Sequence, residues 1–134
     1  MSTVYSSAGL LPVATRFRLQ VLDDGILVLQ WDRSLEVTVA DAVELIRHKE
    51  LLAPGRCSPI LVELNGMVTM ARHAFVLMAE SLDVSAAAIV GSCPVEKILV
   101  THFEAVHRPP YPVAYFESRG QALESLHERT LLTR

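Results

Sequence analysis

Short apolar segments that alternate with segments of helical periodicity constrain the fold of this chain most strongly. The apolar segments cover residues 58–63, 86–90 and 111–116. The segment 86–90 is continuously apolar, which is typical of a strand that is covered on both faces, and the segment 58–63 is centred on Ile60, Leu61 and Val62. Parallel strands need a crossover of a dozen or more residues, usually a helix, and the intervening segments have that length. The sequence therefore predicts a parallel α/β sheet over its second half.

A hairpin is predicted ahead of this sheet. Residues 16–21 and 26–31 read as strands, the first because polar and apolar residues alternate in it with a period of two. Asp23, Asp24 and Gly25 separate the two segments, and Asp-Gly is a strong signal for a tight turn between antiparallel strands. The first two strands are therefore expected to pair antiparallel.

Four helices are expected, and each start has a local signal. Thr38 is followed three residues later by Asp41, and Thr69 is placed to cap the second helix. Pro94 suits the first position of the third helix, and Ser118 with Gln121 forms a capping box for the fourth.

The apolar stripe of each helix predicts its buried face. The residues expected to face inward are Val39, Ala42, Val43 and Ile46 in the first helix, Ala74, Leu77, Met78 and Leu82 in the second, Val95, Ile98, Leu99, His102 and Val106 in the third, and Ala122, Leu123 and Leu126 in the fourth. His102 is thus expected to be a core histidine.

The predicted fold class is α/β. It is a five-stranded mixed sheet with four helices, in which an N-terminal β-hairpin is followed by βαβαβα crossovers. Residues 1–15 are expected to form a flexible N-terminal tail, and residues 16–134 a single domain. No internal repeat or linker divides the chain.

Composition excludes several classes of function. The chain has 12 Lys and Arg against 15 Asp and Glu, and this net charge of −3 argues against a nucleic-acid partner. Two cysteines cannot form a disulfide framework, and no positively charged leader begins the sequence. No window approaches the roughly 20 apolar residues of a membrane span. We therefore expect a cytoplasmic protein without membrane partners.

Metal binding and catalysis find little support in the residue spacing. His102 and His107 are five residues apart, which puts them on different sides of a helix, and neither cysteine has a C-x-x-C partner. Cys93 at a helix start is the best nucleophile candidate, but His102 is about 13 Å away along that helix. Phosphate-binding and serine-hydrolase motifs are absent from the sequence. We predict no enzyme activity, no metal and no cofactor.

The turn between the strand at 58–63 and the second helix is the candidate binding site. Ligands of open α/β sheets gather beyond the carboxyl ends of the strands, where helix N-termini present free N–H groups. The candidate partner- or ligand-binding residues there are Asn65, Thr69, Arg72 and His73. The alternative is a plain capped helix with two solvated side chains.

Several motifs carry a resemblance to a known family. They are the segments 60–66 (ILVELNG), 87–92 (AAIVGS), 108–113 (RPPYPV), 116–118 (FES) and 121–126 (QALESL). Together with the order of elements, they resemble the STAS, or SpoIIAA-like, family of anti-sigma-factor antagonists, and more closely a group of small, mostly uncharacterised bacterial STAS-like proteins. The resemblance covers residues 17–128.

The resemblance implies a non-enzymatic regulatory domain that binds a protein partner through the second helix and its preceding turn. In the anti-sigma-factor antagonists, an Asp-Ser pair at the start of that helix carries a regulated phosphoserine. The aligned positions are Ala71 and Arg72, so the phospho-acceptor serine is missing, and Thr69 is the nearest hydroxyl. Phosphorylation in the manner of the family is therefore not expected.

An alternative function stays open, namely binding of a small apolar ligand or a nucleotide, as some STAS-like domains do. Residues suited to an adaptable apolar pocket are Met67, Met70, Phe75, Met78 and Phe103. A homo-oligomer, specifically a homodimer, is also expected, because the sheet has an edge strand and aromatic residues could anchor an interface. The aromatic candidates are Trp31, Tyr111 and Tyr115.

Overall fold

The structure is a computed structural model that describes residues 16–55 and 57–132, so the expected N-terminal tail lies outside the described residues. The described chain has seven strands and four helices. In chain order they are β1 (Phe17–Val21), β2 (Leu27–Trp31), β3 (Glu36–Val37), α1 (Val39–Leu52), β4 (Ser58–Glu63), β5 (Thr69–Met70), α2 (Arg72–Ser81), β6 (Val84–Val90), α3 (Pro94–His107), β7 (Val113–Phe116) and α4 (Arg119–Leu132).

The main sheet has five strands in the order β1-β2-β4-β6-β7. β1 runs antiparallel to β2, with Phe17 opposite Trp31, and the pairs β2–β4, β4–β6 and β6–β7 are parallel. Gly25 supplies the positive φ of 88° that the hairpin turn requires. The predicted five-stranded mixed sheet with four helices is therefore confirmed.

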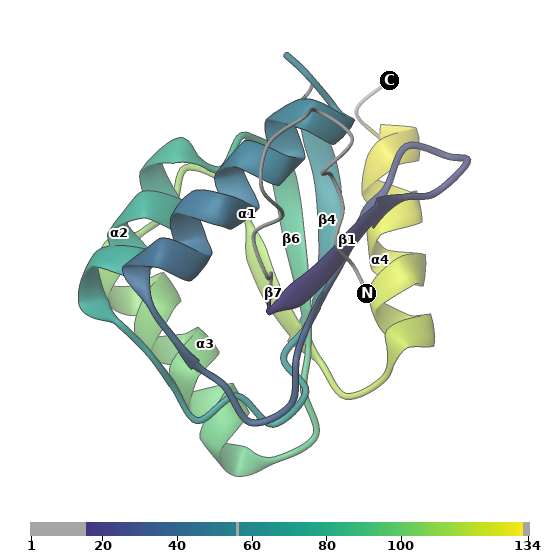
Figure 1. Cartoon of the computed structure of the whole chain (residues 1–134). Helices are drawn as coiled ribbons and strands as arrows, with labels where there is room; N and C mark the ends of the chain where they lie inside the picture. Colours follow the sequence, from purple (N-terminus) through teal and green to yellow (C-terminus); the bar gives the residue numbers. More distant parts are fainter. Residues whose placement is uncertain (1–15, 56, 133–134) are drawn as a thin grey trace.

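Helices cover both faces of this sheet (Figure 1). α1, α2 and α3 lie on one face and enclose the larger core, which includes Trp31, Leu45 and Phe103. α4 lies on the opposite face, where Ala122 and Leu126 pack against a smaller cluster that includes Leu61 and Ala88. The predicted inward residues of α4 are thus confirmed as its buried side.

The capping box predicted for α1 is present and extends to β1. The Thr38 side chain accepts a hydrogen bond from the Asp41 N–H, and the Asp41 carboxylate accepts one from the Thr38 N–H at 2.8 Å. Arg16 donates to both carboxylate oxygens of Asp41, at 3.1 and 2.6 Å, and to the Glu36 carbonyl. The start of α1 is therefore bonded to the chain ahead of β1.

Thr69 does not cap α2, which corrects the sequence prediction. Thr69 and Met70 form β5, a two-residue strand that pairs in parallel with β3 in a second small sheet. Backbone bonds from Val68 N to Leu35 O and from Ala71 N to Val37 O, both 2.8 Å, extend this pairing. α2 consequently begins later, at Arg72, with Ala71 as an N-cap that has no side-chain hydrogen bond.

The buried face of α3 also differs from the prediction. Val95, Ile98 and Val106, predicted to face inward, are 52%, 66% and 57% exposed, and His102 is exposed too. The buried residues of α3 are instead Glu96, Val100 and Phe103. This inner face is offset from the predicted one by about 110° at 100° per residue. In α1 likewise, Val39 and Val43 are exposed.

A helix that spans a membrane needs about 20 predominantly apolar residues. None of the described helices between residues 16 and 132 is both long enough and apolar enough to cross a bilayer.

Candidate functional site

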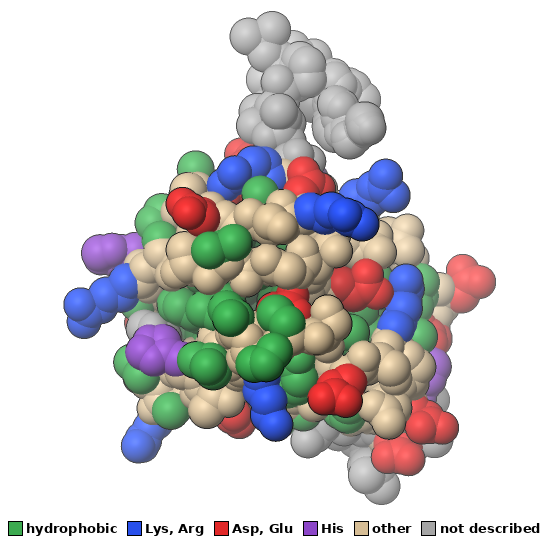
Figure 2. All heavy atoms as spheres, turned by 90° about the horizontal axis from the view of Figure 1, so that it is seen from below, with side chains coloured by type: hydrophobic (Ala, Val, Ile, Leu, Met, Phe, Trp, Pro, Cys, Tyr) green, Lys and Arg blue, Asp and Glu red, His purple; other side chains and the backbone are tan. Residues whose placement is uncertain are grey.

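The starts of α2 and α3 lie at the edge of the sheet where the parallel strands β4 and β6 end (Figure 1). This edge faces the viewer in Figure 2, which shows hydrophobic side chains gathered over its middle, with histidine and basic side chains beside them. It is the edge at which sequence reasoning placed the candidate site.

The turn Asn65-Gly66 has an unusual backbone. Both residues have positive φ, 55° and 79°, a conformation that Asn and Gly adopt more cheaply than other residues. The Asn65 side-chain amide donates to the Trp31 carbonyl at 3.2 Å, and the Asn65 carbonyl accepts from the Ser34 N–H at 3.1 Å. The amide of Asn65, a predicted binding group, thus already holds the turn against the end of β2.

Glu96 is the residue that joins this turn to α3. Its carboxylate accepts hydrogen bonds from three backbone N–H groups, those of Gly66, Ser92 and Cys93, the latter two at 2.6 and 3.2 Å. Burial raises the pKa of Glu96, but the bonds from Ser92 and Gly66 outweigh it, so the pKa of this 1%-exposed carboxyl is lowered. The charge is stabilised in place and fixes the rotation of α3.

Sequence reasoning missed Glu96, although a signal was present. Cys93-x-x-Glu96 has the spacing of a capping box, and Cys93 occupies the N-cap position with Pro94 directly after it. The long-range bond to Gly66 has no such local signal. Because the sequence does not reveal that bond, the apolar stripe was predicted to be the inner face of α3.

Tyr115 packs over Gly91 beside Glu96. A Cβ atom built on Gly91 would lie 2.7 Å from the Tyr115 hydroxyl and 3.0 Å from the Glu96 Cβ. Burial, followed by the nearby charge of Glu96, raises the pKa of Tyr115. The bend between β6 and α3 therefore has no room for a side chain.

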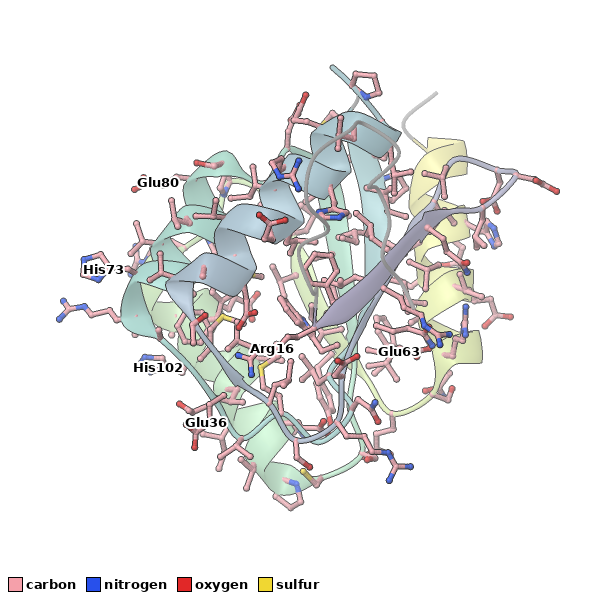
Figure 3. The ribbon with its side chains drawn as sticks, viewed as in Figure 1. Arg16, Glu36, Glu63, His73, Glu80 and His102 are labelled. Carbon is pink, nitrogen blue, oxygen red and sulfur yellow. The ribbon has the colours of Figure 1, made fainter. Side chains whose placement is uncertain are left out.

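Arg72 and His73 occupy the first two positions of α2 and are both exposed. In Figure 3, His73 and His102 lie on the same side of the molecule and point away from the sheet. The rings of His102 and Phe75 have centroids 6.0 Å apart, so α2 and α3 are in contact here. Of the predicted site residues, Arg72 and His73 are solvent-facing basic groups, and Thr69 lies exposed in β5.

The outer face of α3 is the most apolar exposed feature near these residues. We use this name for the surface lined by Pro94, Lys97, Ile98, Thr101, His102 and Ala105, which bound one shallow depression. Val95 and Val106 flank it along the same helix. Three of these five apolar side chains, Val95, Ile98 and Val106, were predicted from the sequence to face the core.

The predicted apolar pocket residues meet inside the protein. Met67, Met70, Phe75, Met78 and Phe103 all line one cavity of about 60 Å³ between α3 and the sheet. Six further residues complete the lining: Trp31, Val62, Leu64, Ile89, Leu99 and Val100.

Other ionisable groups at the edge are engaged in the fold. Glu63, the acidic residue of the 60–66 motif, accepts a hydrogen bond from the Gln30 side chain at 2.7 Å and lies 3.4 Å from Arg119 of α4. Cys93 at this edge is half-buried and Cys57, at the opposite end of β4, is exposed; both are free thiols. Among the described residues, no three His, Cys, Asp or Glu side chains are grouped so that they could hold a metal ion.

Two comparisons relate the chain to known proteins. Residues 20–129 match the profile of a protein family described as a domain of unknown function (DUF7793). A protein of unknown function from Arthrobacter sp. FB24 is 32% identical, with 85% of this chain and 95% of that chain covered and a TM-score of 0.32. No curated protein matches significantly.

A solved structure supports the fold. An uncharacterised protein of the DUF3478 family from Shewanella loihica PV-4, with a SpoIIAA-like fold, has a TM-score of 0.59 at 16% identity, with 82% of this chain and 91% of that chain covered. The SpoIIAA-like fold implied by the resemblance is confirmed. The family matched is DUF7793 rather than a STAS family.

Proposed function

The chain belongs to the DUF7793 family, a domain family of unknown function, and from this premise we propose that it is a non-enzymatic module that binds another protein across α2 and α3. The SpoIIAA-like fold supports a protein-binding role for the edge formed by the Asn65-Gly66 turn and the helix starts. The proposal extends the predicted site from α2 to the neighbouring α3.

The outer face of α3 is the observation that carries the proposal. Ile98 is 66% exposed, and the flanking Val95 and Val106 are more than half exposed. Contiguous exposed apolar surface on a small protein marks interaction sites, whereas single exposed apolar residues need no explanation. Partner binding would bury these side chains and contribute to the free energy of association in proportion to the area removed from water.

Basic side chains define the chemistry of the expected partner. Lys97 and His102 line the same depression as Ile98, and Arg72 and His73 begin the helix that contacts α3 at Phe75. The chain as a whole has a net charge of −3, so the basic character of this surface is opposite in sign to the net charge of the chain. The partner is expected to combine apolar side chains with carboxylates, because complementary charge steers association and orients the complex.

The engagement of nearby carboxylates supports a non-enzymatic role. Glu96 accepts three backbone hydrogen bonds, and Glu63 is held by Gln30 and Arg119. A general base needs a lone pair directed at substrate and a pKa near the working pH. The lowered pKa of Glu96 and its buried position favour a structural role instead.

Site-specific crosslinking tests the proposal. Ile98 is replaced by the photoreactive residue benzoylphenylalanine, and exposed Glu124 of α4 by the same residue as the matched control, in cells of the source organism. We expect a crosslinked protein from position 98 that is absent from position 124 and is lost in the Arg72→Glu and Lys97→Glu variants. Equal crosslinking from both helices, or no crosslink from position 98, would contradict the proposal.

The identity of the crosslinked species also tests self-association, which stays a prediction. A product of twice the chain mass would identify a second copy as the partner. Trp31 and Tyr111, two of the aromatic residues expected to anchor a dimer, are buried within the chain and cannot serve as surface anchors. A dimer would therefore use the outer face of α3 or the edge strands β1 and β7.

A further inference from the structure

The cavity beneath α3 has an almost entirely apolar lining. Ten of its eleven lining residues are aliphatic, phenylalanine or methionine, and they come from β4, the loop before β5, β5, α2, β6 and α3. Its volume of about 60 Å³ is roughly that of two water molecules in the liquid. The eleventh residue is Trp31, whose indole is the one polar donor among these side chains.

Trp31 is 1% exposed, and its Nε1–H has no hydrogen-bond partner among the described residues. A buried donor without a partner costs about 1–3 kcal/mol, and buried tryptophan N–H groups usually find an acceptor. Among the side chains that the structure describes, no other buried nitrogen or oxygen is left without a bond. Trp31, which carries this unpaired donor, is also one of the residues that line the apolar cavity.

A bound water molecule is a poor match for this cavity. A buried water needs two to four polar partners, and the lining side chains offer one donor. An ionised group is a worse match, since no charged side chain lines the cavity to pair with it. A neutral, mostly apolar molecule with a single acceptor oxygen fits both observations.

We propose that this cavity binds a small neutral organic molecule whose carbonyl oxygen accepts a hydrogen bond from the Trp31 Nε1–H and whose hydrocarbon part contacts the methionines. Met67, Met70 and Met78 are unbranched and flexible, so the cavity can enlarge around a ligand larger than its resting volume. Met70, Leu99 and Ile89 are only partly buried, so part of the cavity lining lies close to solvent. This site lies on the inner side of α3 and is independent of the proposed partner surface.

The single tryptophan of the chain makes the test direct. A ¹⁵N-labelled sample has one indole N–H resonance, because Trp31 is the only tryptophan. Titration with 2-hexanone is expected to move this resonance downfield in a saturable manner, as a new acceptor bonds the N–H. The matched probe 2-methyl-1-hexene, in which CH₂ replaces the carbonyl oxygen, is expected to bind about tenfold more weakly, the effect of one net hydrogen bond.

Two variants locate the bound molecule. Val100→Leu adds a methylene group to the cavity lining and is expected to weaken ketone binding at least tenfold, whereas Val95→Leu on the exposed side of α3 leaves it unchanged. The proposal is overturned by an indole resonance that does not respond to the ketone, by equal affinities for ketone and alkene, or by equal binding to both variants. A cross-relaxation signal from a long-lived water to the indole N–H would overturn it as well.

Discussion

The Glu96 carboxylate in α3 accepts a hydrogen bond at 2.5 Å from the backbone N–H of Gly66, thirty residues earlier in the chain. Gly66 has a φ of 79°, so its N–H is presented by a left-handed turn. One buried side chain thus connects the turn after β4 with the first turn of α3.

Glu96→Gln is expected to lower the free energy of unfolding by about 1–3 kcal/mol. The amide keeps the size of the side chain, but its NH₂ group cannot accept, so at least one of the backbone N–H groups of Gly66, Ser92 and Cys93 loses its partner. Urea denaturation at neutral pH measures the change. Glu104→Gln on the exposed side of the same helix is the control, and an equal effect at both positions would contradict the role of Glu96.

Acid is expected to remove the contribution of Glu96 in a defined direction. Because the fold lowers its pKa, the stabilisation is complete above the unfolded value of about 4.3 and is lost as the pH falls through the folded value. The Glu96→Gln variant has no such titration, so its stability is expected to fall less steeply than that of the wild type below about pH 4.3. Unfolding curves at a series of acidic pH values compare the two slopes; parallel slopes would refute the assignment.

Alanine substitutions at two glycines are expected to change stability in opposite directions. Gly91→Ala places a Cβ 2.7 Å from the Tyr115 hydroxyl and is expected to destabilise by about 1–3 kcal/mol. Gly120→Ala meets nothing within 4 Å in α4 and is expected to stabilise by up to about 1 kcal/mol. Thermal unfolding reports both, and a smaller penalty for Gly91→Ala in a Tyr115→Ala background would confirm the contact.

Arg16→Ala is expected to shift acid unfolding to higher pH. Burial raises the pKa of Asp41, but the bonds from Arg16 and Thr38 outweigh it and lower the pKa overall. Without Arg16 the carboxyl protonates more readily, so its stabilisation is lost at a higher pH during acidification. Circular dichroism against pH measures the midpoint. Arg18→Ala, on the exposed side of β1, should leave the midpoint in place, and Arg16→Lys should restore only part of it because Lys lacks the planar pair of nitrogens with which Arg16 bonds the two oxygens.

The rotation of α3 is testable with two truncations. Ile98→Ala is expected to change the free energy of unfolding by less than about 0.5 kcal/mol, because the side chain is exposed. Val100→Ala is expected to cost about 1–3 kcal/mol, because this side chain lies in the core. If denaturant unfolding instead showed Ile98→Ala to be the more destabilising substitution, the inner face predicted from the apolar stripe would be correct.

The elements with local signals were predictable from the sequence. The hairpin at Gly25, the cap at Thr38 and the start of α3 at Pro94 all depend on residues within a few positions of each other. β5 was not predictable in this way, because Thr69 and Met70 form a strand only through pairing with β3, more than thirty residues earlier. The strand therefore replaced the helix cap that Thr69 alone suggested.

The candidate site likewise combines features with local sequence signals and features that depend on long-range contacts. The Asn65-Gly66 turn and the basic start of α2 were visible as local patterns, and the structure places them at the expected edge. The orientation of α3 was not visible as a local pattern, since it depends on the bond between Glu96 and Gly66. A strong apolar stripe on a helix indicates the side chains whose burial would be favourable. In α3, part of that stripe remains at the surface, where a partner could cover it.

Among the elements that the structure describes, only α4 covers the face of the sheet that holds the smaller core cluster, and that arrangement has a consequence during protein synthesis. Ile26, Val28, Leu61 and Ala88 lie on that face, and they pack against Ala122 and Leu126. α4 follows every strand in the sequence, so a ribosome must have released all five strands of the sheet before their shared cover exists. Until then the nascent chain exposes an apolar sheet surface, and this interval is when aggregation or chaperone binding would compete with folding.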